Sequence, residues 1–201
     1  MNHRLVIIGA GGHGRVCAEI AELNGYSEII FLDDRSVDGV EISGKTSDFL
    51  SYLPDSDFFV AIGNNKLRQV FFEKMLSANG NLVSLIHPNC TVSKTARIGI
   101  GSVVMAGVVV NAGAVVGKGV ILNTCSSVDH DCRVEDYSHI SVGAHLAGTV
   151  TIGKGAFIGA GAVVSNNLSV ISGCIVGAAS AVIHDLNKIG TYVGVPARKV
   201  K

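Results

Sequence analysis

The most constraining feature of this sequence is an aliphatic residue at every sixth position from residue 86 to residue 182. All 17 positions of the series hold Ile, Leu or Val, and no insertion interrupts it. The residue four places after each aliphatic one is mostly small, as at Cys90, Ala96 and Ser102. A period of six sustained over this length is typical of the repeats that build a parallel β-helix.

The repeat predicts a triangular prism. Three repeats make one coil of about 18 residues, in which each aliphatic side chain points inward and stacks on the one a coil away. Val128, Leu146 and Val164 are therefore expected to lie above one another. Glycines and small residues beside the corners allow the chain to turn. About five to six coils of this size fit between residues 86 and 187.

The first 85 residues follow a different pattern, in which strand-like and helix-like segments alternate. The pattern predicts strands at 5–8, 28–32, 58–62 and 82–86, and helices at 14–24 and 66–78. Strands that alternate with helices imply a parallel sheet with helical crossovers. We therefore expect an α/β Rossmann-like domain over residues 1–85, followed by the parallel β-helix over residues 86–201.

The segment "GAGGHG" follows the first predicted strand and carries Gly9, Gly11 and Gly14 in the spacing of a dinucleotide-binding turn. Asp33 and Asp34 follow about 20 residues later, where a ribose-binding carboxylate is expected. A domain with four strands is only one mononucleotide-binding half, so the pattern favours the nucleotide of another ligand over NAD. Backbone N–H groups at the helix N-terminus would face the phosphates of that ligand.

Composition and charge argue against several classes of protein. The formal net charge is zero, and no run of Lys and Arg marks a surface for nucleic acid. No apolar run approaches the length of a membrane span, and the features of a signal peptide are not seen. The five cysteines include no C-x-x-C pair, which favours free thiols in a reducing cytoplasm.

Two groups of motifs together resemble one family. They are "GAGGHG…FLDD…AIGNN" in the first domain and "NTCSSVDHDCRVEDYSHIS" in the repeats, with "GVPARKV" at the end. The chain resembles the bacterial UDP-4-amino-sugar N-acetyltransferases of the bacillosamine-pathway type, to which sialic-acid O-acetyltransferases are related. The resemblance implies a left-handed β-helix, acetyl-CoA as co-substrate, a UDP-amino-sugar acceptor and no metal. It also implies surface glycan biosynthesis and a homotrimer with the donor site between subunits.

The candidate base lies in "VDHD". Val128 points inward by phase, so His130 is expected to project outward, between Asp129 and Asp131. A neutral imidazole is a suitable base near pH 7, and a neighbouring carboxylate raises its basicity. The resemblance implies that His130 is the general base and Asp131 its carboxylate partner, although Asp129 could share that role.

The resemblance also implies where the two substrates bind. The residues expected to contact the acceptor are Gly11, Gly12, His13, Asp33, Asp34, Gly63 and Asn123. Those expected to contact acetyl-CoA are His139, Gly148, Ala160 and Ala178. Transfer to the C4 amine is expected to be direct, so Cys125 and Cys132 need not be nucleophiles. For Gly9 and Gly14, ordinary turn and packing chemistry is expected alongside any contact with a ligand.

Three alternatives stay open on the sequence. The same base would serve an O-acetyltransferase that acts on a sugar hydroxyl. A zinc enzyme of the carbonic-anhydrase kind needs three histidines on one metal, for which His130, His139 and His145 are the candidates. Against it, His139 and His145 are one repeat apart and should lie on adjacent faces. The third alternative is a non-catalytic nucleotide-sugar sensor, which the retained His–carboxylate pair disfavours.

Overall fold

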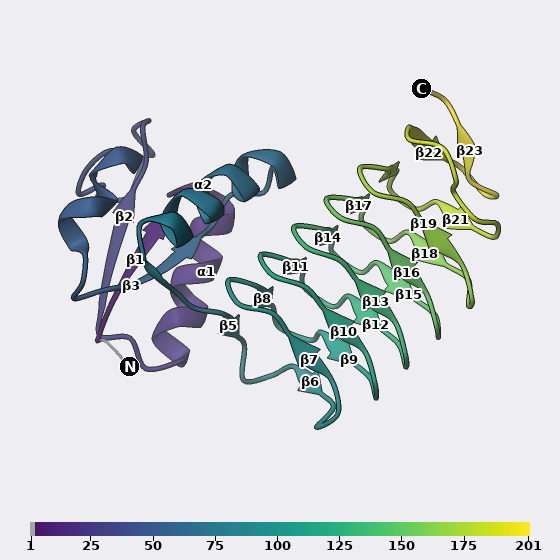
Figure 1. Cartoon of the computed structure of the whole chain (residues 1–201), viewed down its shortest axis with the longest axis horizontal. Coiled ribbons are helices and arrows are strands. Elements are labelled where there is room, and N and C mark those ends of the chain that lie inside the picture. The colour runs from purple at the N-terminus through teal and green to yellow at the C-terminus, as the bar shows by residue number, and fades with distance from the viewer. Residues whose placement is uncertain (1–2) are drawn as a thin grey trace. The chain divides into compact units, whose positions relative to one another are not determined.

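The computed structural model describes residues 3–201, which form one compact unit up to Pro88 and a second over Asn89–Lys201 (Figure 1). The first unit is an α/β domain. The second is a left-handed parallel β-helix of about six coils. The predicted fold class is thus confirmed for both parts of the chain.

The first unit is built on a parallel sheet with the strand order β2-β1-β3-β4. Its elements are β1 Arg4–Ile8, α1 Gly12–Leu23, β2 Glu28–Leu32, the 3₁₀ helix η1 Thr46–Tyr52, β3 Asp57–Val60, α2 Asn65–Ser77, β4 Asn81–Leu82 and β5 Leu85–Ile86. The central strands β1 and β3 are almost wholly buried. Because both of their faces are covered, their sequences are near-continuous apolar runs without a polar alternation.

Two details of the first unit differ from the expectation. The strand predicted at 82–86 is divided into β4 and β5, with Val83 and Ser84 between them. The helix η1 was not predicted, since its sequence "TSDFLSY" has no helical apolar period. It forms because the Asp48 carboxylate accepts the Lys45 backbone N–H at 2.8 Å and because Phe49 is fully buried in the core.

The second unit has short strands on three faces, each strand hydrogen-bonded to the strand one coil away (Figure 1). The first face contains β6 Thr91–Val92, β9 Val109–Val110, β12 Ser127–Val128, β15 His145–Leu146, β18 Val163–Val164 and β21 Ala181–Val182. The second face contains β7 Arg97–Ile98, β10 Val115–Val116, β13 Arg133–Val134, β16 Thr151–Ile152 and β19 Ser169–Val170. The third face contains β8 Val103–Val104, β11 Ile121–Leu122, β14 His139–Ile140, β17 Phe157–Ile158, β20 Ile175–Val176, β22 Thr191–Val193 and the antiparallel β23 Arg198–Lys199.

The inward stack has the predicted phase. Val128 pairs with Leu146, and Leu146 pairs with Val164, in parallel register. All three side chains are at most 1% exposed. Ile86, the first residue of the series, is 38% exposed and lies in β5, the end strand of the eight-stranded sheet that also contains β8.

Small residues at the corners tie neighbouring coils together. The Ser102 hydroxyl donates to the Gly117 carbonyl at 2.9 Å, and the Ser138 hydroxyl donates to the Gly153 carbonyl at the same distance. Cys132 occupies the equivalent position, and its thiol donates to the Ala147 carbonyl at 3.0 Å. This cysteine is 1% exposed and takes the structural role of a serine.

Within residues 3–201, none of the helices combines the length and the apolar character that a membrane crossing requires.

The stack gives a test of the fold. Leu146→Asp would place a carboxylate between Val128 and Val164 with no partner, at a cost of several kcal/mol. Each coil of such a repeat fold contacts only its neighbours, so the damage should spread along the prism. We expect a large fall in the thermal unfolding midpoint, or loss of soluble protein. Ile175→Asp is the matched control, because Ile175 is 45% exposed on the third face. A Leu146→Asp protein as stable as the control would show that the phase is misassigned.

Candidate active site

His130 lies at the corner between the first and second faces, two residues after β12 ends. Its side chain is 58% exposed, as the phase of the repeat predicted. Its Nδ1 lies 2.9 Å from Oδ2 of Asp131. In the neutral ring Nδ1 then carries the proton that is donated to this carboxylate, and Nε2 is the atom free to accept a proton.

The two aspartates beside His130 do different things. Asp129 accepts the His130 backbone N–H at 2.7 Å and the Asn111 side-chain amide at 2.8 Å, both on Oδ1. These bonds hold the pKa of Asp129 below its ordinary value. Asp129 therefore braces the turn, whereas Asp131 contacts the imidazole itself.

The hydrogen bond that His130 donates to Asp131 raises the pKa of His130 above its ordinary value, and the negative charges of Asp129 and Asp131 act in the same direction. Desolvation of the ring lowers the pKa, but by less than the hydrogen bond to Asp131 raises it. The imidazole is thus a stronger base than a free histidine.

Gly148 lies one coil beyond His130 and sets the space available to its ring. A Cβ atom at this position would collide with Nε2 and Cε1 of His130. The family resemblance implied acetyl-CoA binding at Gly148. In the structure the residue packs directly against the imidazole, so any larger side chain would displace the ring.

A second polar pair lies at the corner between the third and first faces. The Asn123 amide nitrogen lies 3.1 Å from Nε2 of His139, while its Oδ1 accepts the Thr124 backbone N–H at 2.8 Å. The amide is thereby oriented so that its NH₂ group donates to the imidazole. His139 is 9% exposed, and its ring meets Phe157 edge to face at 5.1 Å between centroids.

The His130–Asp131 pair and the Asn123–His139 pair lie at opposite ends of β12. The chain runs from Asn123 across β12 of the first face to His130. The structure therefore does not bring His130 together with Asn123 and His139 within one chain. Ala160 and Ala178 are exposed on the corner that carries Asn123, and the Ala179 N–H donates to the Ala160 carbonyl at 2.8 Å.

The first unit has a cavity of about 550 Å³ at the carboxyl ends of its parallel strands. All six acceptor-binding residues predicted in this unit line it: Gly11, Gly12, His13, Asp33, Asp34 and Gly63. A Cβ atom at Gly11, Gly12 or Gly63 would meet no atom within 4 Å. Open space thus borders these backbones, at the N-termini of α1 and α2.

Gly9 and Gly14 serve packing. A Cβ atom at Gly9 would lie 2.8 Å from the Ala61 carbonyl oxygen, and φ is +103° at Gly9. A Cβ atom at Gly14 would collide with the Gly9 carbonyl. These two glycines of the fingerprint let the turn, the sheet and α1 approach closely, which confirms the packing role expected for them.

The two aspartates in the cavity are already bonded to the protein. Asp33 accepts the Ala10 and Arg35 backbone N–H groups, each at 3.0 Å. Burial raises the pKa of Asp33, but these bonds outweigh it and lower the pKa below its ordinary value. Asp34 accepts the Thr46 backbone N–H and hydroxyl at 3.0 Å. Both carboxylates therefore also hold the loops that form the wall.

Among the titratable residues that line the cavity, His13 has the largest shift in pKa. Burial, and then the charge of Arg68, lower the pKa of His13 to about 4. The imidazole is therefore neutral at pH 7 and offers one donor and one acceptor. Arg68 was not predicted at this site, because an arginine on an amphipathic helix is ordinarily exposed to solvent.

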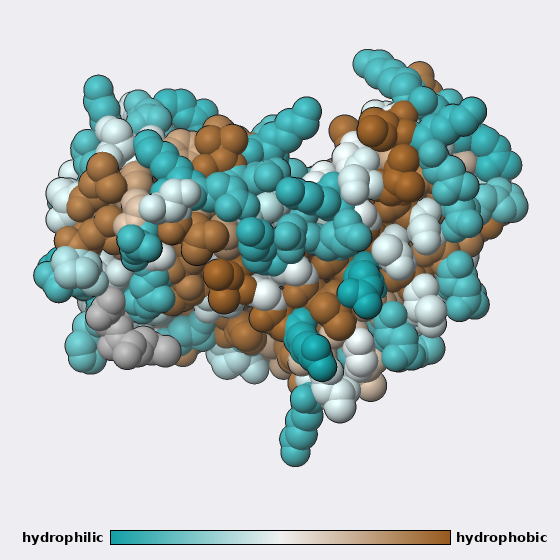
Figure 2. Space-filling model, viewed as in Figure 1, coloured by the Kyte–Doolittle hydropathy of each residue, from teal (hydrophilic) through white to brown (hydrophobic). Residues whose placement is uncertain are grey.

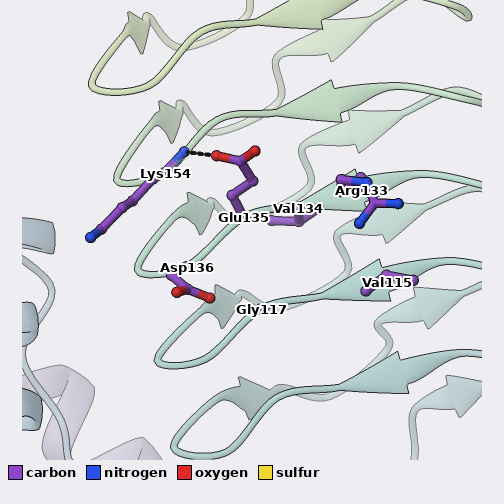
Figure 3. A pocket seen from close by; sticks show the side chains of 7 residues that line it. All are labelled: Val115, Gly117, Arg133, Val134, Glu135, Asp136 and Lys154. Carbon is purple, nitrogen blue, oxygen red and sulfur yellow. Dashed lines mark hydrogen bonds between the residues drawn. The ribbon is translucent and has the colours of Figure 1, made fainter.

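Another hollow, of about 300 Å³, lies along the second face (Figure 3). Arg133, Glu135 and Lys154 line it with charge, and the Glu135 carboxylate accepts the Lys154 backbone N–H at 2.9 Å. It contains neither His130 nor the Asn123–His139 pair. Nothing predicted from the sequence lies in it.

The zinc alternative gains no support from the geometry. His139 lies on the third face, and His145 lies on the first face with Nδ1 2.9 Å from the Ser127 hydroxyl. Over the described range 3–201, no three His, Cys, Asp or Glu side chains converge as metal ligands would.

Comparison with known proteins agrees with both units. The family model "PglD N-terminal domain" matches residues 4–75, and "Bacterial transferase hexapeptide (six repeats)" matches residues 131–166. The acetyltransferase domain of PglB from Neisseria gonorrhoeae FA1090, solved in complex with acetyl coenzyme A, is 45% identical with a TM-score of 0.95, and the match covers 100% of both chains. The chain belongs to the family of hexapeptide-repeat sugar N-acetyltransferases.

Two further relatives extend the comparison. PerB from Caulobacter crescentus, solved in complex with CoA and GDP-perosamine, is 38% identical over 98% of this chain and 97% of its own, with a TM-score of 0.92. The UDP-N-acetylbacillosamine N-acetyltransferase of Bacillus subtilis (strain 168) is 35% identical over 111 residues. That match spans only 51% of the Bacillus protein. The family resemblance of the motifs is thereby confirmed.

The contact with Asp131 can be tested by titration. Nuclear magnetic resonance of the imidazole should give a midpoint for His130 above about 6.5, the value of a free histidine. Asp131→Asn removes the charge and weakens the hydrogen bond to the imidazolium, so the midpoint should fall. Asp136→Asn at the next corner is the control and should leave it unchanged. An unchanged midpoint in Asp131→Asn would contradict the assigned contact.

Proposed function

We propose that this protein transfers the acetyl group of acetyl-CoA to the C4 amine of a UDP-4-amino-dideoxy sugar, in the cytoplasm, for surface glycan biosynthesis. The observation that carries the proposal is the full-length similarity to an acetyltransferase domain that binds acetyl coenzyme A. The exposed His130–Asp131 pair supplies a base suited to that chemistry. The curated UDP-sugar relative supports the choice of nucleotide.

The mechanism follows from the state of His130. An amine acceptor with a pKa of about 8 is largely protonated at neutral pH and must lose a proton to attack. Nε2 of His130 takes that proton, and the freed amine attacks the thioester carbonyl. When the C–S bond breaks, the second proton of the nitrogen goes to the CoA sulfur, so that CoA leaves as the thiol and His130 later releases its own proton to solvent. Asp131 holds the ring through Nδ1 and stabilises the imidazolium that forms.

No acyl-enzyme is required. Cys132 lies two residues from His130, but its thiol is buried and donates to the Ala147 carbonyl. Burial also raises the pKa of this thiol, so the nucleophilic thiolate is disfavoured. The acceleration instead comes from holding amine and thioester in contact beside the base.

The nucleotide of the acceptor is proposed to bind in the cavity of the first unit. Gly11 and Gly12 lie at the N-terminus of α1 and border open space. Their backbone N–H groups are therefore suited to binding a diphosphate. His13, Asp33, Asp34 and Gly63 complete the predicted set. One mononucleotide-binding half of this size fits UDP and not NAD.

The split between the two corners of the prism favours a homotrimer. His130 stands at one edge of the first face, whereas Asn123 and His139 stand at the other. A second copy packed edge to edge would bring its Asn123–His139 pair beside His130. Acetyl-CoA would then lie between the subunits, with Gly148 on one side and Ala160 and Ala178 on the other. Repetition of this contact closes a ring of three.

The exposed apolar residues agree with such packing. Val163 on the first face is 42% exposed, and Val142 on the Asn123 corner is 48% exposed. Figure 2 shows apolar side chains at the surface of the prism coils. Contact with neighbouring subunits would remove this surface from water.

The activity is tested by mass spectrometry of the products formed from acetyl-CoA and a panel of UDP- and GDP-linked amino sugars. We expect one stable amide product, on a UDP-4-amino sugar. A base-labile ester would instead identify an O-acetyltransferase, and a GDP-linked product would correct the choice of nucleotide.

His130→Ala should lower kcat by about 10²- to 10⁴-fold without loss of fold, because the side chain is exposed. His3→Ala is the control, since it removes another exposed imidazole and should leave kcat unchanged.

The shared site is tested by mixing two inactive variants. One is His130→Ala, and the other is Asn123→Ala combined with His139→Ala. If each site takes its base from one subunit and its second pair from the next, random mixing in equal amounts restores about one quarter of the sites. Co-expression followed by an activity assay measures this. Activity no higher than that of the separate variants would mean that each site lies within one chain.

A further inference from the structure

Arg68 is a buried cation of the first unit that the proposed reaction does not use. It lies on α2 and is 1% exposed. One of its terminal nitrogens donates to the Ile62 carbonyl at 2.9 Å and to the Gly63 carbonyl at 3.2 Å. The other donates to Oδ1 of Asn65 at 2.9 Å. The guanidinium thus spans the whole turn between β3 and α2.

The turn held by Arg68 forms one wall of the cavity. Ile62, Gly63 and Asn64 all line it, whereas Arg68 stands behind them. The Asn64 side chain accepts the Leu67 backbone N–H at 2.9 Å and caps α2. A Cβ atom at Gly63 would meet no atom within 4 Å, so that side of the turn borders open space. The hydrogen bonds of Arg68 and Asn64 therefore hold this wall of the cavity in shape.

We propose that Arg68 is a positioning residue for the nucleoside diphosphate part of the acceptor: its guanidinium fixes the Ile62–Asn65 turn in the shape that closes the cavity. The inference rests on the proposed function, in which this cavity binds the nucleotide sugar. Arg68 itself lines no part of the cavity and does not need to touch the ligand.

The same guanidinium also acts on another residue of the cavity, His13, through its charge. His13 lines the cavity, and Arg68 adds to burial in lowering the pKa of His13 to about 4. A neutral His13 keeps an acceptor nitrogen available at pH 7. Arg68 therefore holds the Ile62–Asn65 turn in shape and adds a smaller contribution, after burial, to keeping His13 neutral.

Variants of Arg68 can separate its effect on the shape of the turn from its effect on the pKa of His13. The planar fork of arginine reaches two carbonyl groups and the Asn65 amide together, whereas an ammonium group is a single compact centre. Arg68→Lys keeps the positive charge but loses the fork. Arg68→Met keeps the apolar stem and loses both the charge and the hydrogen bonds. Asn65→Ala removes one acceptor and leaves the arginine in place.

The experiment is calorimetric titration of the folded variants with UDP, together with magnetic resonance of His13. We expect Arg68→Lys and Arg68→Met each to weaken UDP binding at least about ten-fold, and Asn65→Ala to weaken it less. The His13 midpoint should rise in Arg68→Met and stay low in Arg68→Lys. The KM for acetyl-CoA should not change in any variant.

Lys66→Met is the matched control, since it removes an exposed positive charge from the first turn of the same helix. It should bind UDP as the unmodified protein does. Unchanged UDP affinity in both Arg68 variants would overturn the inference, even if the His13 midpoint moves. Failure of the unmodified protein to bind UDP would contradict the proposed function instead. If Arg68→Met does not fold, Arg68→Lys and Asn65→Ala carry the test.

Discussion

The stacking of one coil on the next is the constraint on which the second unit depends. An inward residue of the middle coils sits between two aliphatic neighbours 18 positions away, as Leu146 does between Val128 and Val164. The backbone ladder repeats at the same interval, since the Asp129 N–H donates to the Leu146 carbonyl at 3.1 Å. Side-chain burial and backbone pairing thus require the same period, and an insertion in one strand would break both. The exposed positions of the corners and faces are less constrained.

This division determines where chemistry can be placed. His130 and Asn123 both occupy corners, where the side chain does not enter the stack. A corner residue is nonetheless held firmly, because its neighbours are tied to adjacent coils. Asp129 is bonded to Asn111 of the preceding coil, and Gly148 of the following coil lies against the His130 ring. The regular prism thereby fixes the orientation of an exposed imidazole, which a mobile surface loop would not do.

The sequence predicted the features that depend on phase. The period of six gave the inward residues and the outward direction of His130, and the glycine spacing gave the turn before α1. It could not give contacts that depend on rotamers across coils, such as Asn123 with His139. It also missed Arg68, because burial of an arginine depends on the carbonyl groups that surround it in the folded turn. Ile86 shows a further limit, since the phase does not reveal that a residue in an end strand stays exposed.

Two histidines show how environment assigns roles to the same side chain. At the prism corner, the hydrogen bond donated to Asp131 raises the pKa of His130, so the exposed ring gains affinity for a proton. In the cavity of the first unit, burial and Arg68 lower the pKa of His13 to about 4, so that ring stays neutral. A base must take up a proton during the reaction, whereas a residue that recognises a ligand must keep one protonation state. The opposite shifts fit proton transfer at His130 and constant hydrogen bonding at His13.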